Sequence, residues 1–280
     1  MNQANALLNG AGVPPNTDDA AWIKVLSDHL RERARIAELH IKPANLIRSA
    51  LFAVRCSPND PTVLKVLAAL ESGQHRVYAD FGIPMSSTEV VLWPNQTAFQ
   101  NYTSQYSQQG ISEFVAALTL TKLIDTRDGP MVLGEEINVF IDARTNIFST
   151  LAHEYGHVAV RELSRGRAVP VWFNEGIATA VEGGYEGYLP RVRTAAENGS
   201  LLSMADMREW HVDGERAFLA YSQANSIIDF IVARPNWGRE AVLGILRKIG
   251  HDVPPDEAFQ SVLGMSQEEL WRNWSAFGIK

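Results

Sequence analysis

The sequence predicts an α+β fold, in which strands and helices share the first half of the chain and helices alone form the second. Three short runs, at 76–81, 89–93 and 136–141, are rich in β-branched or aromatic residues and are expected to form strands. From residue 146 onward, apolar residues recur at the spacing of a helix face almost to the end. No internal repeat is present that would indicate a solenoid or a propeller instead.

The first 75 residues favour helices. Apolar residues follow one helix face in the segments 18–39, 43–52 and 61–70. We therefore expect a helical N-terminal extension at 1–75, followed by a larger α+β domain at 76–280. A chain of 280 residues is long enough to bury a substantial core in either one or two such units.

Between the predicted strands at 89–93 and 136–141, helical and turn-forming segments alternate. A stretch rich in Gln and Tyr beyond residue 94 and an amphipathic stretch at 112–123 predict two helices. Turn-forming residues gather at 125–130. The apolar residues of 136–141 then alternate with polar ones, which indicates a strand with one buried face.

The chain ends in a predicted helix whose first turn carries a capping box. Ser266 and Glu269 stand three residues apart, where each side chain can accept a hydrogen bond from the other's backbone N–H group. The buried face of this helix is expected to consist of Leu270, Trp271, Trp274 and Phe277.

Composition narrows the function classes. The net charge of −7 and the pI near 5.5 argue against a nucleic-acid partner, because such proteins usually carry a basic surface. No stretch reaches the roughly 18–20 apolar residues that a membrane-spanning helix needs. The first thirty residues lack the pattern of a signal peptide. We favour an extracytoplasmic location with a targeting segment outside this sequence, and the oligomeric state stays open.

A possible metal site begins at His153 and His157, which are four residues apart in a helical segment. Residues i and i+4 share a helix face, so both imidazoles can bind one ion. Glu154, next to the first histidine, can reach a water molecule in an open coordination position and accept its proton. The spacing HExxH therefore indicates a zinc site with its own general base.

Glu175 is a candidate for a third metal ligand. It stands in the apolar and aromatic run 171–178, where a carboxylate is costly to bury unless it is paired or bound to a metal. On its own it can also be a helix-start glutamate that the helix dipole favours. Together with the two histidines it completes the two-His, one-Glu set of a catalytic zinc site, with the fourth position open for water.

The two motifs together resemble the gluzincin metallopeptidases, and within them the peptidase MA-like family. Its members carry HExxH on one helix and their third ligand in a W-x-x-E-G segment on the next, as in Trp172-x-x-Glu175-Gly176 here. Weaker similarities continue through Tyr221-Ser222-Gln223-Ala224, Ala258-Phe259, Leu263-Gly264 and the Trp-containing final helix. The resemblance covers residues 76–280. It implies a zincin-like domain, with a small sheet, an HExxH helix and a helical C-terminal subdomain, that hydrolyses peptide bonds with Zn²⁺.

The resemblance also suggests roles for residues outside the ligand set. Tyr221 would hydrogen-bond the oxyanion as water attacks the substrate carbonyl, although its ring can equally be part of the helix core. Thr179 and Glu182 are candidates to hydrogen-bond the ligating histidines. Thermolysin-like gluzincins have an aspartate at the position of Thr179, so this chain departs from their pattern. The strand at 136–141 would be the edge strand to which an extended peptide substrate adds.

Two other functions remain open at this point. The HEYGH sequence also resembles cytoplasmic regulatory metallopeptidases that act on repressor-like proteins, but no helix-turn-helix with a basic recognition helix is visible. A non-catalytic zinc-binding or peptide-binding module on a peptidase scaffold is the other alternative. The presence of Glu154 argues against it, because a module that only binds needs no general base.

Overall fold

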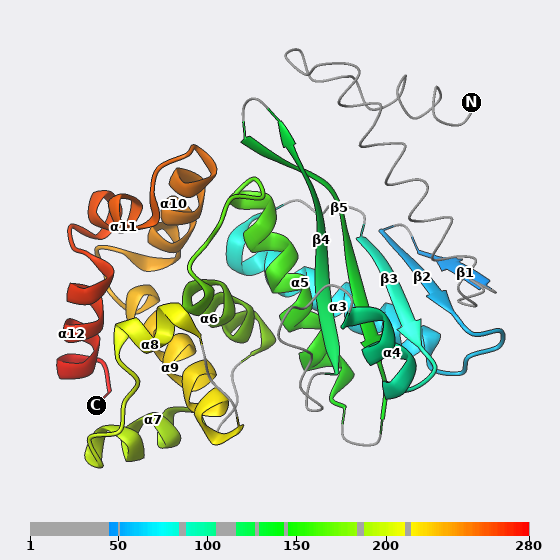
Figure 1. The fold of residues 1–280 in the computed structure, drawn as a ribbon, viewed down its shortest axis with the longest axis horizontal. Helices are drawn as coiled ribbons and strands as arrows, with labels where there is room; N and C mark the ends of the chain where they lie inside the picture. The colour runs from blue at the N-terminus through cyan, green and yellow to red at the C-terminus, as the bar shows by residue number, and fades with distance from the viewer. Residues whose placement is uncertain are drawn as a thin grey trace.

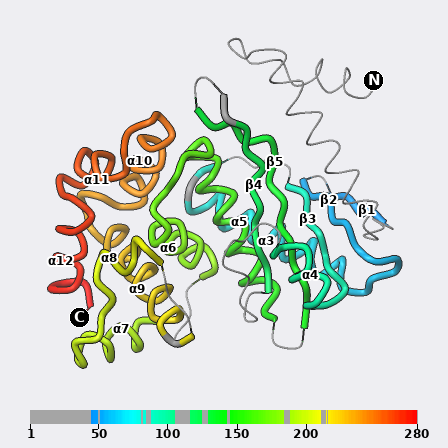
Figure 2. Tube along the Cα trace, viewed as in Figure 1, coloured from blue at the N-terminus to red at the C-terminus, as the bar shows by residue number. Residues whose placement is uncertain are grey.

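The structure, a computed structural model, places a sheet at one end of the molecule and most of the helices at the other (Figure 1). The tube in Figure 2 follows the chain from the blue strands of the sheet to the red C-terminal helix at the far side. This mixed architecture confirms the predicted α+β class. The described residues are 45–49, 51–83, 88–104, 116–126, 129–142, 145–183, 188–210 and 214–279.

The described strands form one five-stranded sheet of order β1-β2-β3-β5-β4. Its three inner strands, β2 (Phe52–Cys56), β3 (Thr88–Trp93) and β5 (Gly129–Phe140), run parallel to one another. The outer strands β1 (Asn45–Arg48) and β4 (Ala117–Thr126) are antiparallel to their neighbours. One edge of the sheet is therefore β4, which pairs with β5 alone among the described strands.

Helices cover both faces of the sheet. On one face, α3 (Val63–Phe81) and α5 (Ile147–Leu163) pack against the strands and against each other. Their apolar side chains and those of the inner strands form the main core. On the opposite face, α4 (Gln96–Thr103) covers a smaller apolar cluster (Figure 1). The members of that cluster are Val91, Trp93, Phe99, Tyr102 and Phe140.

The second half of the described chain is helical, as predicted. Its helices are α6 (Val171–Glu182), α7 (Tyr188–Glu197), α8 (Met204–Glu209), α9 (Gly214–Val232), α10 (Gly238–Gly250), α11 (Pro255–Leu263) and α12 (Gln267–Phe277). α5 and α6 lie between the sheet and the remaining helices (Figure 1). No helix within the described ranges is both long and apolar enough to span a bilayer.

The capping box of the last helix is confirmed, but its buried face is smaller than expected. The Ser266 hydroxyl accepts from the Glu269 N–H, and the Glu269 carboxylate accepts from the Ser266 N–H. Leu270 and Trp274 are fully buried. The prediction for Phe277 is wrong, because its side chain is 64% exposed in the last turn.

The predictions for the N-terminal segments need correction where they can be compared. The segment 43–52 is not a helix, because β1 and β2 occupy its described part. The helix at 61–70 is confirmed but extends as α3 to Phe81, so the strand predicted at 76–81 is wrong. The segment 18–39 lies outside the described residues. The boundary predicted between residues 75 and 76 falls within α3, and the division into two domains stays a prediction.

The helix predicted at 112–123 is also wrong in its described part, which forms β4. Leu118 and Leu120 pack toward the α4 side of the sheet, while Thr119 faces α5. This alternation is the period of a strand, so a β signal was present in the sequence. Within the turn predicted at 125–130, residues 125–126 and 129–130 are the paired ends of β4 and β5, and residues 127 and 128 lie outside the described residues. The edge strand is therefore β4, and not 136–141, which belongs to the inner strand β5.

Candidate metal centre

Helix α5 presents His153 and His157 on one face, as their spacing predicted. The planes of the two rings are nearly perpendicular, and their centroids lie 4.8 Å apart. The helix that faces them, α6, approaches closely because residue 156 is a glycine. A Cβ atom at Gly156 would lie 2.8 Å from the Cα atom of Ala178, closer than packing permits. The histidines are thus held within reach of a side chain on α6.

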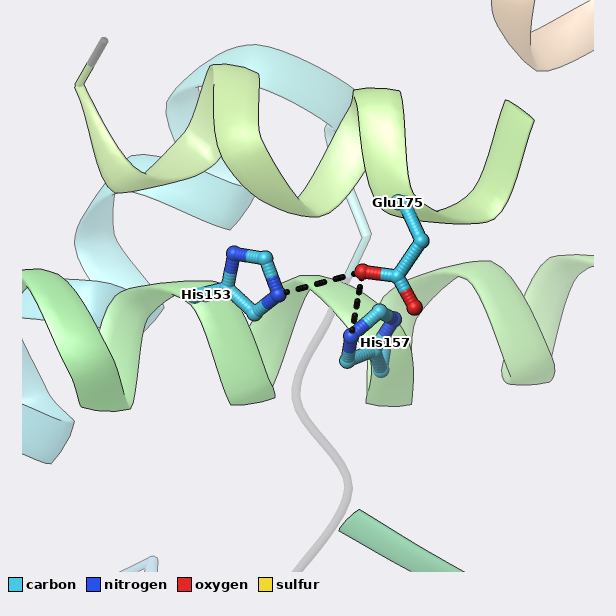
Figure 3. Close-up of side chains that lie close together, drawn as sticks. All are labelled: His153, His157 and Glu175. Carbon is cyan, nitrogen blue, oxygen red and sulfur yellow. Dashed lines mark ion pairs between the residues drawn. The ribbon is translucent and has the colours of Figure 1, made fainter. Parts of the chain in front are cut away.

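That side chain is Glu175. Its Oε2 atom lies 3.4 Å from Nε2 of His153 and 3.6 Å from Nε2 of His157, between the two helices (Figure 3). Trp172 and Phe173, three and two residues before Glu175 on α6, are fully buried and anchor the start of the helix. The three residues predicted from the sequence as metal ligands therefore converge on one point.

The donor set suits a zinc ion. The three donor atoms all lie within 4.8 Å of one another. Ligands at about 2.1 Å from a tetrahedral zinc stand roughly 3.4 Å apart, close to the two distances between Glu175 and the histidines. The Oε2 atom of Glu175 is buried, and apart from the two imidazole nitrogens it has no polar partner among the described residues. A buried carboxylate oxygen of this kind is costly unless a cation satisfies it.

Other side chains contact the Nδ1 atoms of the two imidazoles, whose Nε2 atoms face Glu175, and so orient the rings. Nδ1 of His153 lies 3.3 Å from Oε2 of Glu182, one of the two candidate partners named from the sequence. Nδ1 of His157 lies 3.0 Å from Oδ1 of Asn174, which the sequence analysis missed. Thr179, the other candidate, is fully buried, and its Oγ1 has no hydrogen-bond partner in the described chain. Hydrogen bonds to the distal nitrogens fix which nitrogens face the centre.

The metal-free site binds protons strongly. Burial lowers the pKa of His153, but hydrogen bonds to the carboxylates of Glu175 and Glu182 outweigh it and raise this pKa to about 10. Burial raises the pKa of Glu175, but the neighbouring His157 and His153 outweigh it and leave this pKa below its ordinary value. Without a metal the site is therefore an imidazolium–carboxylate cluster. A metal ion must displace that proton, because only a neutral imidazole nitrogen is a ligand.

Glu154 lies on the side of α5 that faces the sheet edge and is 6% exposed. The Oγ1 atom of Thr119 on β4 donates to its Oε2 atom at 2.6 Å and also lies 3.1 Å from its carbonyl oxygen. Thr119 was missed because its segment was assigned to a helix. The signal that could have found it is the Leu-Thr-Leu-Thr alternation at 118–121.

Tyr221 on α9 lies beside the histidines and is half-buried. Its ring makes edge contacts with His153, at 6.2 Å between centroids, and with Trp210, at 5.3 Å. The negative charge of Glu175, then burial, and then Glu154, Tyr188 and Glu182 raise the pKa of its hydroxyl well above the ordinary value. The phenol is therefore a protonated hydrogen-bond donor at neutral pH.

Comparison with known families locates the same region. A family model described as the Peptidase MA superfamily matches residues 138–279, which include both histidines, Glu154, Glu175 and Tyr221. Among curated proteins, no match was found.

Proposed function

The chain belongs to the peptidase MA superfamily, and we propose that it is a zinc-dependent metallopeptidase of the gluzincin type. The convergence of His153, His157 and Glu175 carries this proposal. These residues would hold the ion with two nitrogens and one oxygen, which leaves a coordination position for water or substrate. When bound, zinc supplies a Lewis acid for the scissile carbonyl and lowers the pKa of a water molecule.

In this proposal Glu154 is the general base. Because it follows His153 directly and is not one of the ligands, its carboxylate can accept a proton from the attacking water. The same carboxyl group can then deliver the proton to the leaving amine. The hydrogen bond from Thr119 to its Oε2 atom restricts the orientation of the carboxylate and leaves Oε1 to take the proton.

Tyr221 is the proposed donor to the oxyanion. Its ring stands next to His153, and its hydroxyl stays protonated for the reason given above. A donor placed where negative charge develops stabilises the transition state more than the ground state.

The edge strand β4 is the proposed docking strand for the substrate. It has a neighbour on only one side among the described strands, and Thr119 connects it to the base. A peptide that pairs with the free edge would lie extended beside α5. The proposal thus still has an extended peptide pair with the edge strand, but that strand is β4 and not 136–141.

Metal analysis combined with peptide cleavage tests the function. Purified protein loaded with zinc should cleave members of a mixed peptide library, with new termini identified by mass spectrometry. The matched control is Glu154→Gln, which should retain the metal and lose activity by about 10²–10⁴-fold, since an amide cannot accept the proton. Equal cleavage by both proteins would contradict the proposal. Retention of peptide binding without any turnover in the wild type would instead favour the non-catalytic module.

A further inference from the structure

A second pocket lies along α9, on the side where α7 and the end of α12 pack. Its volume is about 890 Å³, larger than a buried water site and comparable to a ligand pocket. Tyr188, Phe230 and Phe277 line it with aromatic surface. Its polar lining includes Asn225 and Asp229, which come from the same face of α9.

One row of side chains on α9 leads from the candidate metal centre to the pocket. Tyr221, Asn225 and Asp229 follow at intervals of four residues, so they form a single ridge on the helix. Asn225, the first member of this row that lines the pocket, lies one turn beyond the proposed oxyanion donor. At 1.5 Å per residue, Asp229 stands about 12 Å along the axis from Tyr221.

Asp229 presents a negative charge that no cation in the described chain neutralises. Asn225 Nδ2 donates to its Oδ2 atom at 2.7 Å and so orients the carboxylate. Arg234, the cationic residue of the lining, lies over the Phe230 ring instead, with its guanidinium carbon 4.3 Å from the ring centroid. Asp229 is exposed as a residue, but the atoms around its carboxyl group exclude enough water to raise its pKa, and the Asn225 hydrogen bond opposes this rise. A positively charged ligand would interact favourably with such a carboxylate.

A further polar atom points to a missing ligand. Asn225 is 6% exposed, and its Oδ1 atom is buried without a hydrogen-bond partner among the described residues. An amide oxygen in this position accepts from an N–H group. Asn225 and Asp229 together therefore offer two acceptors for a ligand that carries several N–H donors.

We propose that this pocket is a substrate subsite that binds a lysine or arginine side chain of the peptide, an inference that rests on the proposed peptidase function. The carboxylate of Asp229 would receive the ammonium or guanidinium group, and the aromatic walls would contact the aliphatic stem. An extended peptide advances about 3.3–3.6 Å per residue. The distance from Tyr221 then places the basic residue roughly three to four positions from the scissile bond.

Equilibrium binding separates this subsite from catalysis. The probe is a fluorescein-labelled, alanine-rich nonapeptide with one lysine, compared with the same peptide carrying norleucine or glutamate. Binding is measured by anisotropy on the Glu154→Gln background, so that no cleavage interferes. The lysine peptide should bind on the order of tenfold more tightly than the norleucine peptide. Asp229→Asn should abolish this difference, and Asp229→Lys should transfer the preference to the glutamate peptide.

Two matched variants control for nonspecific effects. Asp229→Glu keeps the charge and should keep the lysine preference. Glu257→Gln removes one negative charge from the exposed surface of α11, away from the lining residues, and should change nothing. In protein that keeps Glu154 and can cleave, kcat/KM for the three peptides should follow the same order as their affinities. Moving the lysine along the peptide should show how many residues separate it from the cleaved bond.

The outcomes for the subsite and for the proposed function are distinguishable. If the protein shows no preference for lysine, or if Asp229→Asn keeps the full preference, the subsite does not exist, whether or not peptides are cleaved. If the preference depends on Asp229 but no peptide is cleaved by the protein that keeps Glu154, the subsite stands and the peptidase function fails.

Discussion

Thr119 on the sheet edge donates a 2.6 Å hydrogen bond to the carboxylate of Glu154 on α5. This contact links the strand proposed to bind the substrate to the residue proposed to move the proton. A change in the position of β4 would therefore alter the orientation of the base. Thr119 is therefore a positioning residue: it acts through Glu154 and does not need to contact the reacting atoms itself.

Replacement of Thr119 tests this role. Thr119→Val removes the donor and keeps the side-chain shape, so kcat should fall by about 5- to 30-fold, the equivalent of 1–2 kcal/mol. KM and zinc content should change little, because neither the ligands nor the strand edge is altered. Steady-state kinetics and elemental analysis measure these quantities. Thr119→Ser restores a hydroxyl and should recover most of kcat, and a failure of this rescue would argue for a purely structural role.

Zinc content tests the ligand set directly. Wild-type protein should contain about one zinc per chain, and His153→Ala or His157→Ala should lose it, since two protein ligands bind zinc far more weakly than three. His75→Ala serves as the control, because His75 is exposed on α3, away from the ligand cluster. Full retention of zinc in both ligand variants would disprove the assignment.

Protons should compete with the metal. The pKa of His153 is raised from 6.5 to about 10 in the metal-free site, so its proton must leave before zinc binds. Apparent zinc affinity should increase by about tenfold per pH unit between these two values. Competition titrations with a chelator of known affinity at several pH values provide the measurement. An affinity independent of pH over this range would contradict the proton-loaded cluster.

The same pKa shift has a consequence for stability without metal. A raised pKa means that the folded state binds the proton more tightly than the unfolded state does. The resulting stabilisation is complete below pH 6.5 and is lost as the pH rises toward about 10. The melting temperature of the zinc-free protein should therefore decrease across this window. Glu182→Gln removes one carboxylate that raises the pKa of His153, so the decrease in its melting temperature should be smaller and should end at a lower pH.

The contact between His157 and Asn174 supplies a fifth test. Asn174→Ala removes the group that orients the ring, and zinc affinity should fall by roughly 10- to 100-fold. Thr179→Val provides the comparison, since Thr179 has no hydrogen bond to either histidine. It should leave zinc affinity unchanged and keep or raise the melting temperature, because it removes a buried hydroxyl without a partner. The reverse pattern would restore Thr179 as the orienting residue.

The cluster of His153, His157 and Glu175 was predictable because it depends largely on local geometry. His153 and His157 need only a helix to share a face, and the surrounding apolar spacing indicated that helix. Glu175 was identifiable as a carboxylate in an apolar run. Asn174 and Thr119 were not, because their roles arise from how α6 and β4 pack against α5.

Tertiary packing also explains the errors in the predicted secondary structure. Gly73 suggests a helix end in the sequence, yet α3 continues through it. A Cβ atom there would lie 3.0 Å from the Cα atom of Ala152, so the glycine permits α3 and α5 to pack closely. The segment 112–123 contains both a helical and an alternating pattern. Its described part is a strand because β5 supplies a partner, which no local window reveals.

Tyr221 provides the last prediction, since its position fits both an oxyanion donor and a core residue. Its ring contacts His153 and Trp210, while Ala220 and Ala224 beside it on α9 are fully buried. Tyr221→Phe removes the hydroxyl and keeps these ring contacts, so the free energy of unfolding should change by at most about 1 kcal/mol. If the hydroxyl donates to the oxyanion, kcat should fall by roughly 10²–10³-fold with KM little altered, because the lost contact forms mainly in the transition state. Kinetics and thermal unfolding of the same preparation decide between the roles. A lower melting temperature with normal turnover would leave Tyr221 as a core residue.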